Sequence, residues 1–233
     1  MKKTILVLII GLSMVAGNVF ALPVAQNDQV QFVNYDTSNY EGNYQFHNIT
    51  QNSDFSTFCL EKNEHINYGE EYYVGDISLW ASLGGTDHED DGIHDPTRDY
   101  ISKQTQWLYY SFISGTLNVG GISNFNTSTG IEALQDAFWH LEDEIGFIDN
   151  DLAFELVYAA NSAVAGYGAD LGYVRVMNIF YAFDVTDSEG NVVHRAGEYA
   201  QSQLVGAPVP EPATLILLGS GLAGLAFYRR KRK

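Results

Sequence analysis

This 233-residue chain contains very little cysteine and few positively charged residues. It contains one cysteine, Cys59, so no disulfide can form within the chain, and its 12 lysines and arginines face 29 acidic residues. Seven of the 12 cations lie in the first three or the last five residues, so residues 22–206 carry a formal charge of −23. Such a surface repels nucleic acids and anionic lipids, which excludes both as partners of this region.

The motifs of common enzymes are also missing. The sequence has no Gly-x-Ser-x-Gly elbow, no His-Glu-x-x-His pair and no glycine-rich loop of the kind that binds phosphate. The acidic run Glu142-Asp143-Glu144 is interpreted as an exposed helix face rather than a pair of glycosidase carboxylates. We therefore expect no cofactor and no ordinary catalytic turnover, and a hydrolase is the least favoured class.

One acidic loop partly matches a calcium-binding pattern. Asp87, Glu89 and Asp91 alternate and Gly92 follows at the sixth position, but Arg98 stands where the closing bidentate glutamate belongs. The same loop contains two histidines, but two ligands are too few to hold a softer metal ion. The loop is expected to be solvated, with these three carboxylates as weak candidates for a metal site.

The N-terminus has the three parts of a secretory signal peptide. Lys2-Lys3 form the charged region, residues 5–15 the apolar region, and Val19-Phe20-Ala21 the small-residue cleavage site. Residues 1–21 are therefore predicted to direct export through the general secretory (Sec) pathway, and the mature chain is expected to begin at about Leu22.

The C-terminus, residues 207–233, has three parts in a fixed order. The turn Pro210-Glu211-Pro212 is followed by an apolar run over about 213–228, which predicts a transmembrane helix. Five cations then end the chain and are expected to stay on the cytoplasmic side: Arg229, Arg230, Lys231, Arg232 and Lys233. Everything before Pro210 is therefore placed outside the cytoplasm.

This tail closely resembles the PEP-CTERM sorting signal of Gram-negative bacteria that make extracellular polysaccharide. The resemblance implies that exosortase, a membrane protease-transpeptidase, recognises the tail and removes the helix and cations. The protein would be anchored in the inner membrane before sorting and would end at the cell surface or in the extracellular matrix. The alternative is a plain C-terminal membrane anchor.

Residues 22–206 are predicted to form one α+β domain, a β-rich sandwich or barrel with a helical insertion of two to three helices. Strand patterns occupy these ranges: 30–33, 44–46, 55–60, 72–74, 77–83, 173–176, 179–185 and 192–205. Helical patterns cover 99–114, 131–145 and 151–165. The central helix is the clearest, with apolar residues at 3-4-3-4 spacing from Ile131 to Ile145, and Thr129 with Glu132 is predicted to form its capping box.

Two short segments suggest chemistry for the single cysteine. Phe58-Cys59-Leu60 lies in a predicted strand, and Gln135-Asp136-Ala137-Phe138-Trp139 lies on the central helix. Together they resemble the two signature motifs of bacterial thioester domains (TED-like surface domains). That resemblance implies that the Cys59 thiolate attacks the Gln135 side-chain carbonyl, ammonia leaves, and an internal thioester remains.

A thioester is an activated acyl group and needs shielding from water. Phe58, Phe138 and Trp139 are the expected shield, because Phe138 and Trp139 lie three and four residues beyond Gln135 on the same helix. The pattern departs from the family at Leu134, where many members have Thr or Ala, and at Phe138, where Ile is commoner. A domain that keeps the fold without the bond therefore stays open, with Cys59 as a small buried hydrophobic residue.

Two classes of function remain from the sequence. In the first, the protein is an adhesive surface or matrix component that acylates an amine or hydroxyl on a protein or polysaccharide, once per molecule. In the second, it is a non-reactive structural or carbohydrate-binding component of the exopolysaccharide or biofilm matrix.

Overall fold

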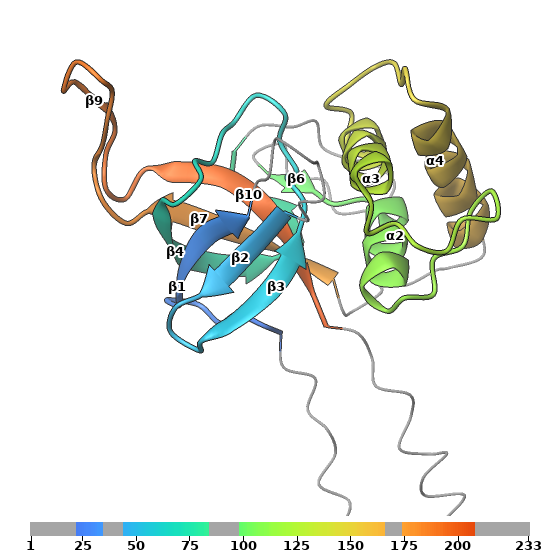
Figure 1. Cartoon of the computed structure of the whole chain (residues 1–233), viewed down its shortest axis with the longest axis horizontal. Helices are drawn as coiled ribbons and strands as arrows, with labels where there is room; N and C mark the ends of the chain where they lie inside the picture. Colours follow the sequence, from blue (N-terminus) through green and yellow to red (C-terminus); the bar gives the residue numbers. More distant parts are fainter. Residues whose placement is uncertain (1–21, 35–43, 84–97, 166–173, 208–233) are drawn as a thin grey trace, which may run out of the picture. The chain divides into compact units, whose positions relative to one another are not determined.

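The computed structural model describes residues 22–34, 44–83, 98–165 and 174–207 (Figure 1). These belong to one compact unit, Leu22–Pro208. The predicted signal peptide, the Pro210-Glu211-Pro212 motif with its helix and basic tail, and the acidic loop with Asp87, Glu89 and Asp91 lie outside the described residues.

A six-stranded antiparallel sheet forms the body, in the order β10-β7-β4-β1-β2-β3. The strands are β1 (Gln29–Asn34), β2 (Tyr44–Asn48), β3 (Ser53–Thr57), β4 (Glu71–Ser78), β7 (Val174–Tyr181) and β10 (Tyr199–Gly206). Alternate residues of β2 and β3 are buried, as period-two patterns predict. Two further pairs of short antiparallel strands form small sheets of their own, β5 (Trp80–Ala81) with β6 (Asp99–Tyr100) and β8 (Val185–Thr186) with β9 (Val192–His194).

The two edges of the sheet meet just beyond β3. The Leu204 N–H donates to the Phe58 carbonyl at 2.9 Å, and the Leu60 N–H donates to the Ser202 carbonyl at 3.1 Å. Cys59 and Gln203 are therefore an antiparallel pair. The segment that follows the edge strand β3 is thus hydrogen-bonded to β10, the strand at the opposite edge of the sheet.

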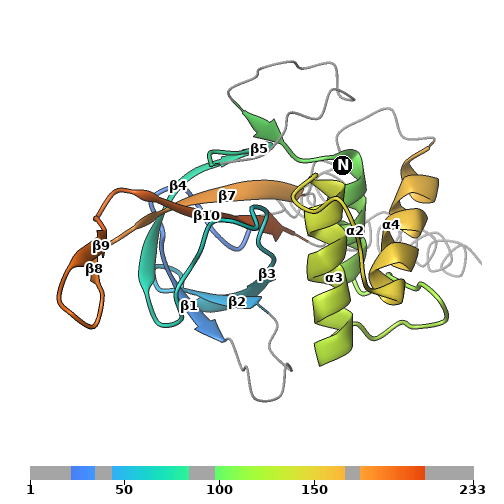
Figure 2. The same ribbon diagram turned by 90° about the horizontal axis from the view of Figure 1, so that it is seen from above.

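Three helices lie together at one end of the curled sheet (Figures 1 and 2). They are α2 (Lys103–Ile113), α3 (Ser128–Leu141) and α4 (Asp151–Val164), and all three lie between β6 and β7 in the chain. The predicted third helix is confirmed, with Asn150 as its N-cap. The first helix begins later than expected, since residues 99–100 are in β6 and Ser102 caps α2.

Helix α3 differs from its prediction at both ends. Its N-cap is Thr127, whose side chain accepts from the Gly130 N–H at 3.1 Å, so the capping box at Thr129 is wrong. A side chain at Gly130 would collide with the Phe125 backbone, because a Cβ there would lie 2.6 Å from the Phe125 carbonyl oxygen. The helix stops at Leu141 because Asp143 has a φ of 58°. Ile145 therefore lies beyond the helix that its spacing predicted.

The acidic run that follows α3 is not an exposed face throughout, contrary to the expectation. Glu142 is 2% exposed, and its Oε1 accepts from the Ser102 N–H at 3.2 Å and the Ser102 hydroxyl at 2.9 Å, as well as from the Thr105 hydroxyl. A buried carboxylate is tolerated where several donors satisfy it. Glu142 thus ties the end of α3 to the beginning of α2.

The interior contains two hydrophobic clusters. The first, which we call the strand cluster, is built mainly from the sheet and includes Val30, Phe46, Tyr72, Met177 and Ile179. The second, the helical cluster, packs the buried faces of α2, α3 and α4 on residues at the end of the sheet. Its members include Phe58, Leu60, Leu108, Leu134, Phe138, Leu156, Val176 and Leu204.

The α+β class, with a large antiparallel sheet and three helices inserted between its strands, is confirmed. Within the described ranges, no helix combines the length and the apolar content that crossing a membrane requires.

Candidate functional site

Cys59 lies where the sheet closes, in a backbone arrangement that leaves one side available. The hydrogen bonds to β10 come from its neighbours Phe58 and Leu60, so Cys59 and Gln203 form a non-hydrogen-bonded pair. In such a pair the side chains approach closely, while the N–H and C=O of each residue point away from the partner strand. The Cys59 backbone groups therefore face away from β10.

The Gln135 side chain occupies that available side. Its Oε1 accepts from the Cys59 N–H at 3.0 Å, and its Nε2 donates to the Cys59 carbonyl at 2.8 Å. Cys59 is 4% exposed and Gln135 is 3% exposed, so both hydrogen bonds are shielded from solvent. The structure thus brings together the two residues that the motifs singled out, although 76 positions separate them in the sequence.

The sulfur contacts a residue that the sequence analysis missed. Gln203 Nε2 lies 3.5 Å from Cys59 Sγ and also donates to the Gln201 carbonyl at 3.1 Å. Gln203 is fully buried on β10. Its place beside the cysteine depends on the pairing of segments 144 residues apart, and no local pattern indicates that pairing.

The surroundings of Cys59 favour the neutral thiol. Burial raises the pKa of Cys59 to about 12, the hydrogen bond from Gln203 lowers it, and the charge of Glu61 raises it. A free thiolate is therefore scarce near neutral pH, and the sulfur can act as a nucleophile only if a base removes its proton during the attack.

Two of the three predicted shielding residues form an aromatic wall. The rings of Phe58 and Phe138 lie 4.9 Å apart between centroids, and both are buried. Phe112 and Tyr109 of α2 pack on Phe58 at 5.4 and 6.3 Å. The side of the Cys59 segment that faces the helices is therefore covered by rings from two helices.

Trp139 has a different place. It is half-buried, and the Lys62 amine lies 5.7 Å from the centroid of its ring. Its buried Nε1 has no hydrogen-bond partner among the described residues. Trp139 and Lys62 flank the site on the side that is nearer to solvent.

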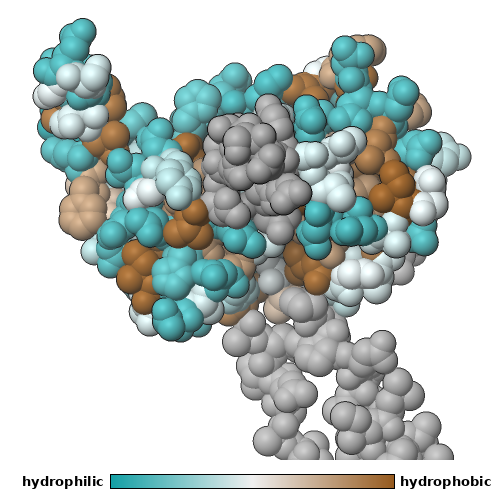
Figure 3. Space-filling view, viewed as in Figure 1, coloured by the Kyte–Doolittle hydropathy of each residue, from teal (hydrophilic) through white to brown (hydrophobic). Residues whose placement is uncertain are grey.

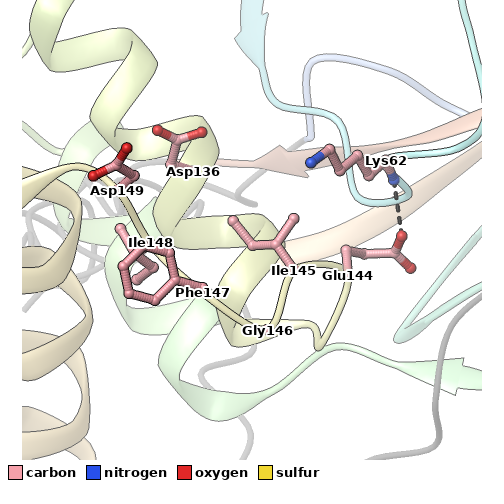
Figure 4. A pocket seen from close by; sticks show the side chains of 8 residues that line it. All are labelled: Lys62, Asp136, Glu144, Ile145, Gly146, Phe147, Ile148 and Asp149. Carbon is pink, nitrogen blue, oxygen red and sulfur yellow. Dashed lines mark hydrogen bonds between the residues drawn. The ribbon is translucent and has the colours of Figure 1, made fainter.

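A pocket of about 480 Å³ adjoins this side of the site (Figure 4). It is lined by Lys62, Asp136, Glu144, Ile145, Gly146, Phe147, Ile148 and Asp149. Lys62 follows Cys59 by three residues, and Asp136 is the residue after Gln135. The Lys62 N–H donates to Glu144 at 3.0 Å, which fixes the loop after α3 against the Cys59 segment.

No metal site is found in the described part of the chain. A group of three or more His, Cys, Asp or Glu side chains suited to a metal ion does not occur in these ranges. The candidates Asp87, Glu89 and Asp91 fall outside them.

Comparison with known proteins adds information on the C-terminus alone. The family model of the PEP-CTERM protein-sorting motif matches residues 208–233, which confirms the predicted sorting motif and implies exosortase as the processing partner. The motif marks an exported protein that is held at the membrane for sorting and then displayed at the surface. No curated protein and no solved structure matches the chain.

Proposed function

We propose that this protein is an exosortase-sorted component of the cell surface or extracellular matrix that attaches covalently to an amine or hydroxyl through an internal Cys59–Gln135 thioester. The observation that carries the proposal is the pair of hydrogen bonds between the Gln135 amide and the Cys59 backbone. They hold a carboxamide against a buried cysteine from a rigid helix.

The hydrogen bond from Cys59 N–H supplies what an amide needs to act as an acyl donor. A carboxamide reacts slowly because its carbonyl carbon is a weak electrophile, and negative charge builds on the oxygen during attack. An N–H aimed at that oxygen in a buried site stabilises the charge as it develops. Here the Cys59 N–H lies 3.0 Å from Gln135 Oε1, so the nucleophile's own backbone polarises the carbonyl.

Proximity supplies the second requirement. Holding thiol and amide in one buried place converts a bimolecular reaction into an intramolecular one. The cysteine lies on a segment hydrogen-bonded to β10, and the glutamine lies in the middle of α3. The amide therefore comes from a regular helix and the cysteine from an isolated bridge beside β10.

The pocket beside Lys62 and Trp139 is the proposed approach for the acyl acceptor. The aromatic wall of Phe58 and Phe138 protects the bond on the helical side, whereas the pocket is open to solvent and carries Asp136, Glu144 and Asp149. Carboxylates attract a protonated amine to the pocket before it loses its proton and attacks. The protein reacts once, so it is not an enzyme with turnover.

One observation favours the second candidate, a non-reactive matrix component that binds carbohydrate. Large rings are exposed on the helical side, with Phe147 78%, Phe154 63% and Tyr158 70% accessible. Figure 3 shows apolar surface in the region of α4, which carries two of these residues. Exposed rings of this kind provide flat contact surface, and they require no thioester.

The test of the attachment chemistry is intact-mass analysis of the full chain in detergent. A thioester lowers the mass by one ammonia, and incubation with methylamine adds one amine. Cys59→Ser and Gln135→Ala should each abolish both changes, and Gln104→Ala is the control, because Gln104 lies on α2 and its side chain bonds Asn161 rather than Cys59. A full-mass wild type that never incorporates methylamine leaves the non-reactive candidate.

The test of sorting uses the C-terminal tail. Replacing Pro210-Glu211-Pro212 by three alanines, or deleting residues 229–233, should leave unprocessed protein in the inner membrane. Exchanging the five cations for other cations is the control. Normal processing of both variants would mean that exosortase does not read this tail.

A further inference from the structure

Glu61 is a buried carboxylic acid beside the cysteine, and one of its two carboxyl oxygens has no hydrogen-bond partner among the described residues. It lies two residues after Cys59 and is 1% exposed. Its Oε2 accepts from the Ser202 N–H at 2.7 Å, and its backbone carbonyl accepts from the Gln201 side chain. Its Oε1 is buried and has no hydrogen-bond partner among the described residues. Leaving a buried acceptor unpaired costs stability, so such groups call for a functional reason.

The charge on Glu61 is coupled to the thiol. Burial raises the pKa of Glu61 from 4.5 to about 7, the Ser202 hydrogen bond lowers it, and the charge of Glu144 raises it. Glu61 in turn raises the pKa of Cys59. The two groups are therefore close enough for the charge of one to oppose ionisation of the other.

Within the described ranges, the groups that donate hydrogen bonds to Glu61 are uncharged. They are the Ser202 N–H, which donates to the carboxylate, and the Gln201 side chain, which donates to the backbone carbonyl. Glu144, which contacts the Lys62 N–H, is the other carboxylate that acts on Glu61, and the Lys62 amine lies over the Trp139 ring. Gln203 touches the sulfur but is an amide with its nitrogen toward it, so it orients the sulfur and cannot accept its proton.

We propose that Glu61 is the proton-transfer residue of the Cys59–Gln135 site. This proposal rests on the proposed thioester and names the group that moves protons as the bond forms and opens. A base whose affinity for protons is balanced near neutral pH both accepts and returns a proton efficiently.

The formation step balances as follows. The Glu61 carboxylate takes the thiol proton while Cys59 Sγ forms a bond to the Gln135 carbonyl carbon, and the oxygen takes up negative charge facing the Cys59 N–H. The Glu61 carboxyl then gives its proton to the amide nitrogen as the C–N bond breaks. Ammonia leaves, the thioester remains, and Glu61 is again a carboxylate.

Opening by an amine follows the same path in reverse. The amine nitrogen attacks the thioester carbonyl carbon and loses a proton to Glu61, and the C–S bond breaks as Glu61 protonates the sulfur. The products are a substituted amide at residue 135 and a free Cys59 thiol. Glu61 is unchanged after each acylation.

The test measures opening of the thioester by methylamine at pH 5.5 to 8.5, using the full chain in detergent, with each rate divided by the fraction of unprotonated amine. For the wild type, this corrected rate should fall as Glu61 becomes protonated below a midpoint near its pKa of about 7. Glu61→Gln should lower the corrected rate at pH 8 by about a hundredfold and remove the midpoint. Glu61→Asp, which keeps a carboxyl group, should restore a midpoint.

Glu132→Gln is the matched control, because it removes the same charge from an exposed position on α3. It should keep the wild-type rate and midpoint. A folded Glu61→Gln protein that has lost the thioester altogether also supports the proposal, since formation uses the same proton transfer.

Two results would overturn the role of Glu61 while leaving the thioester in place. One is a Glu61→Gln protein with the wild-type rate and midpoint. The other is a wild-type corrected rate that does not vary with pH. This result would exclude Glu61 as the proton-transfer residue even if no Glu61 variant folds. A wild type without any methylamine adduct is a different failure, because it removes the proposed thioester itself.

Discussion

A buried acid near the strand cluster and one near the helical cluster differ in how their oxygens are paired. At the edge of the strand cluster, Asp28 is buried, and its Oδ2 accepts from the Ala25 N–H and from the side chains of Asn48 and Gln51. At the edge of the helical cluster, Glu61 Oε1 and Trp139 Nε1 are buried without partners among the described residues. A buried polar group that is fully paired serves the fold, whereas an unpaired one costs stability and indicates a function.

The clusters also differ in how their elements meet. Hydrogen-bonded strands hold the strand cluster, so its parts are fixed by backbone pairing. The helical cluster joins α3 to the sheet largely by side chains, and the Gln135 contact with Cys59 is one of the polar links. The proposed chemistry lies at this joint, where packing brings a residue of α3 to the bridge residue Cys59 beyond β3.

The largest expected effect separates the two clusters by matched truncations. Phe138→Ala in the helical cluster and Phe46→Ala in the strand cluster both remove a fully buried ring. Each should lower the free energy of unfolding by about 3–5 kcal/mol. Phe138→Ala alone should speed hydrolysis of the thioester, because it opens the aromatic wall. Denaturant titration and intact mass followed over time measure the two quantities.

Equal rates of thioester hydrolysis in these two variants would contradict the proposed shielding of the bond by the helical cluster. The wall would then have no protective role, and general loosening of the domain would control access of water to the bond.

A smaller effect concerns the pH dependence of stability. Because the pKa of Glu61 is raised from 4.5 to about 7 in the folded protein, folding favours the protonated acid. Its contribution is fully present below about pH 4.5 and is lost as pH rises through about 7. Removing it with Glu61→Gln should flatten the decline in the free energy of unfolding over this range by roughly 2–3 kcal/mol.

Urea denaturation at several pH values measures this slope, and Glu132→Gln shows how much an exposed carboxylate contributes. If Glu61→Gln and Glu132→Gln change the slope equally, Glu61 titrates like a surface acid and its unpaired oxygen has no special meaning.

The smallest expected effect tests where α3 begins. Thr127→Ala should lower the free energy of unfolding by about 1 kcal/mol, because it removes the acceptor for the Gly130 N–H. Thr129→Ala is the control at an exposed position and should cost less than about 0.5 kcal/mol. Thermal or urea denaturation separates them. A larger cost at Thr129 would restore the capping box that the sequence predicted.

Local patterns predicted the elements but not the polar contacts between them. The apolar spacing of Ile131, Leu134 and Phe138 identified α3, and two short motifs identified Cys59 and Gln135. Each of these patterns could be recognised because it lies within a single short stretch of sequence. The predicted start of α3 was wrong because two threonines near the start of the helix are both reasonable caps. The predicted end was wrong because the backbone turn at Asp143 ends the helix one turn before the apolar pattern does.

The remaining site residues depend on pairing across the whole domain. Gln203 meets Cys59, and Ser202 meets Glu61, only because β10 closes the sheet against residues 58–60, and strand register over that separation leaves no local signature. Glu142 looks like part of a solvated acidic run, and its burial follows from donors at Ser102 and Thr105 on another helix.

Peptide mapping of the full chain, under conditions that preserve thioesters, tests directly whether Cys59 and Gln135 are bonded. We expect one cross-linked species that joins the peptide with Cys59 to the peptide with Gln135 and is lighter by one ammonia than the two peptides together. Methylamine treatment should separate them and leave the amine on residue 135. Two unlinked peptides of full mass, or a link from Cys59 to Gln203, would contradict this expectation.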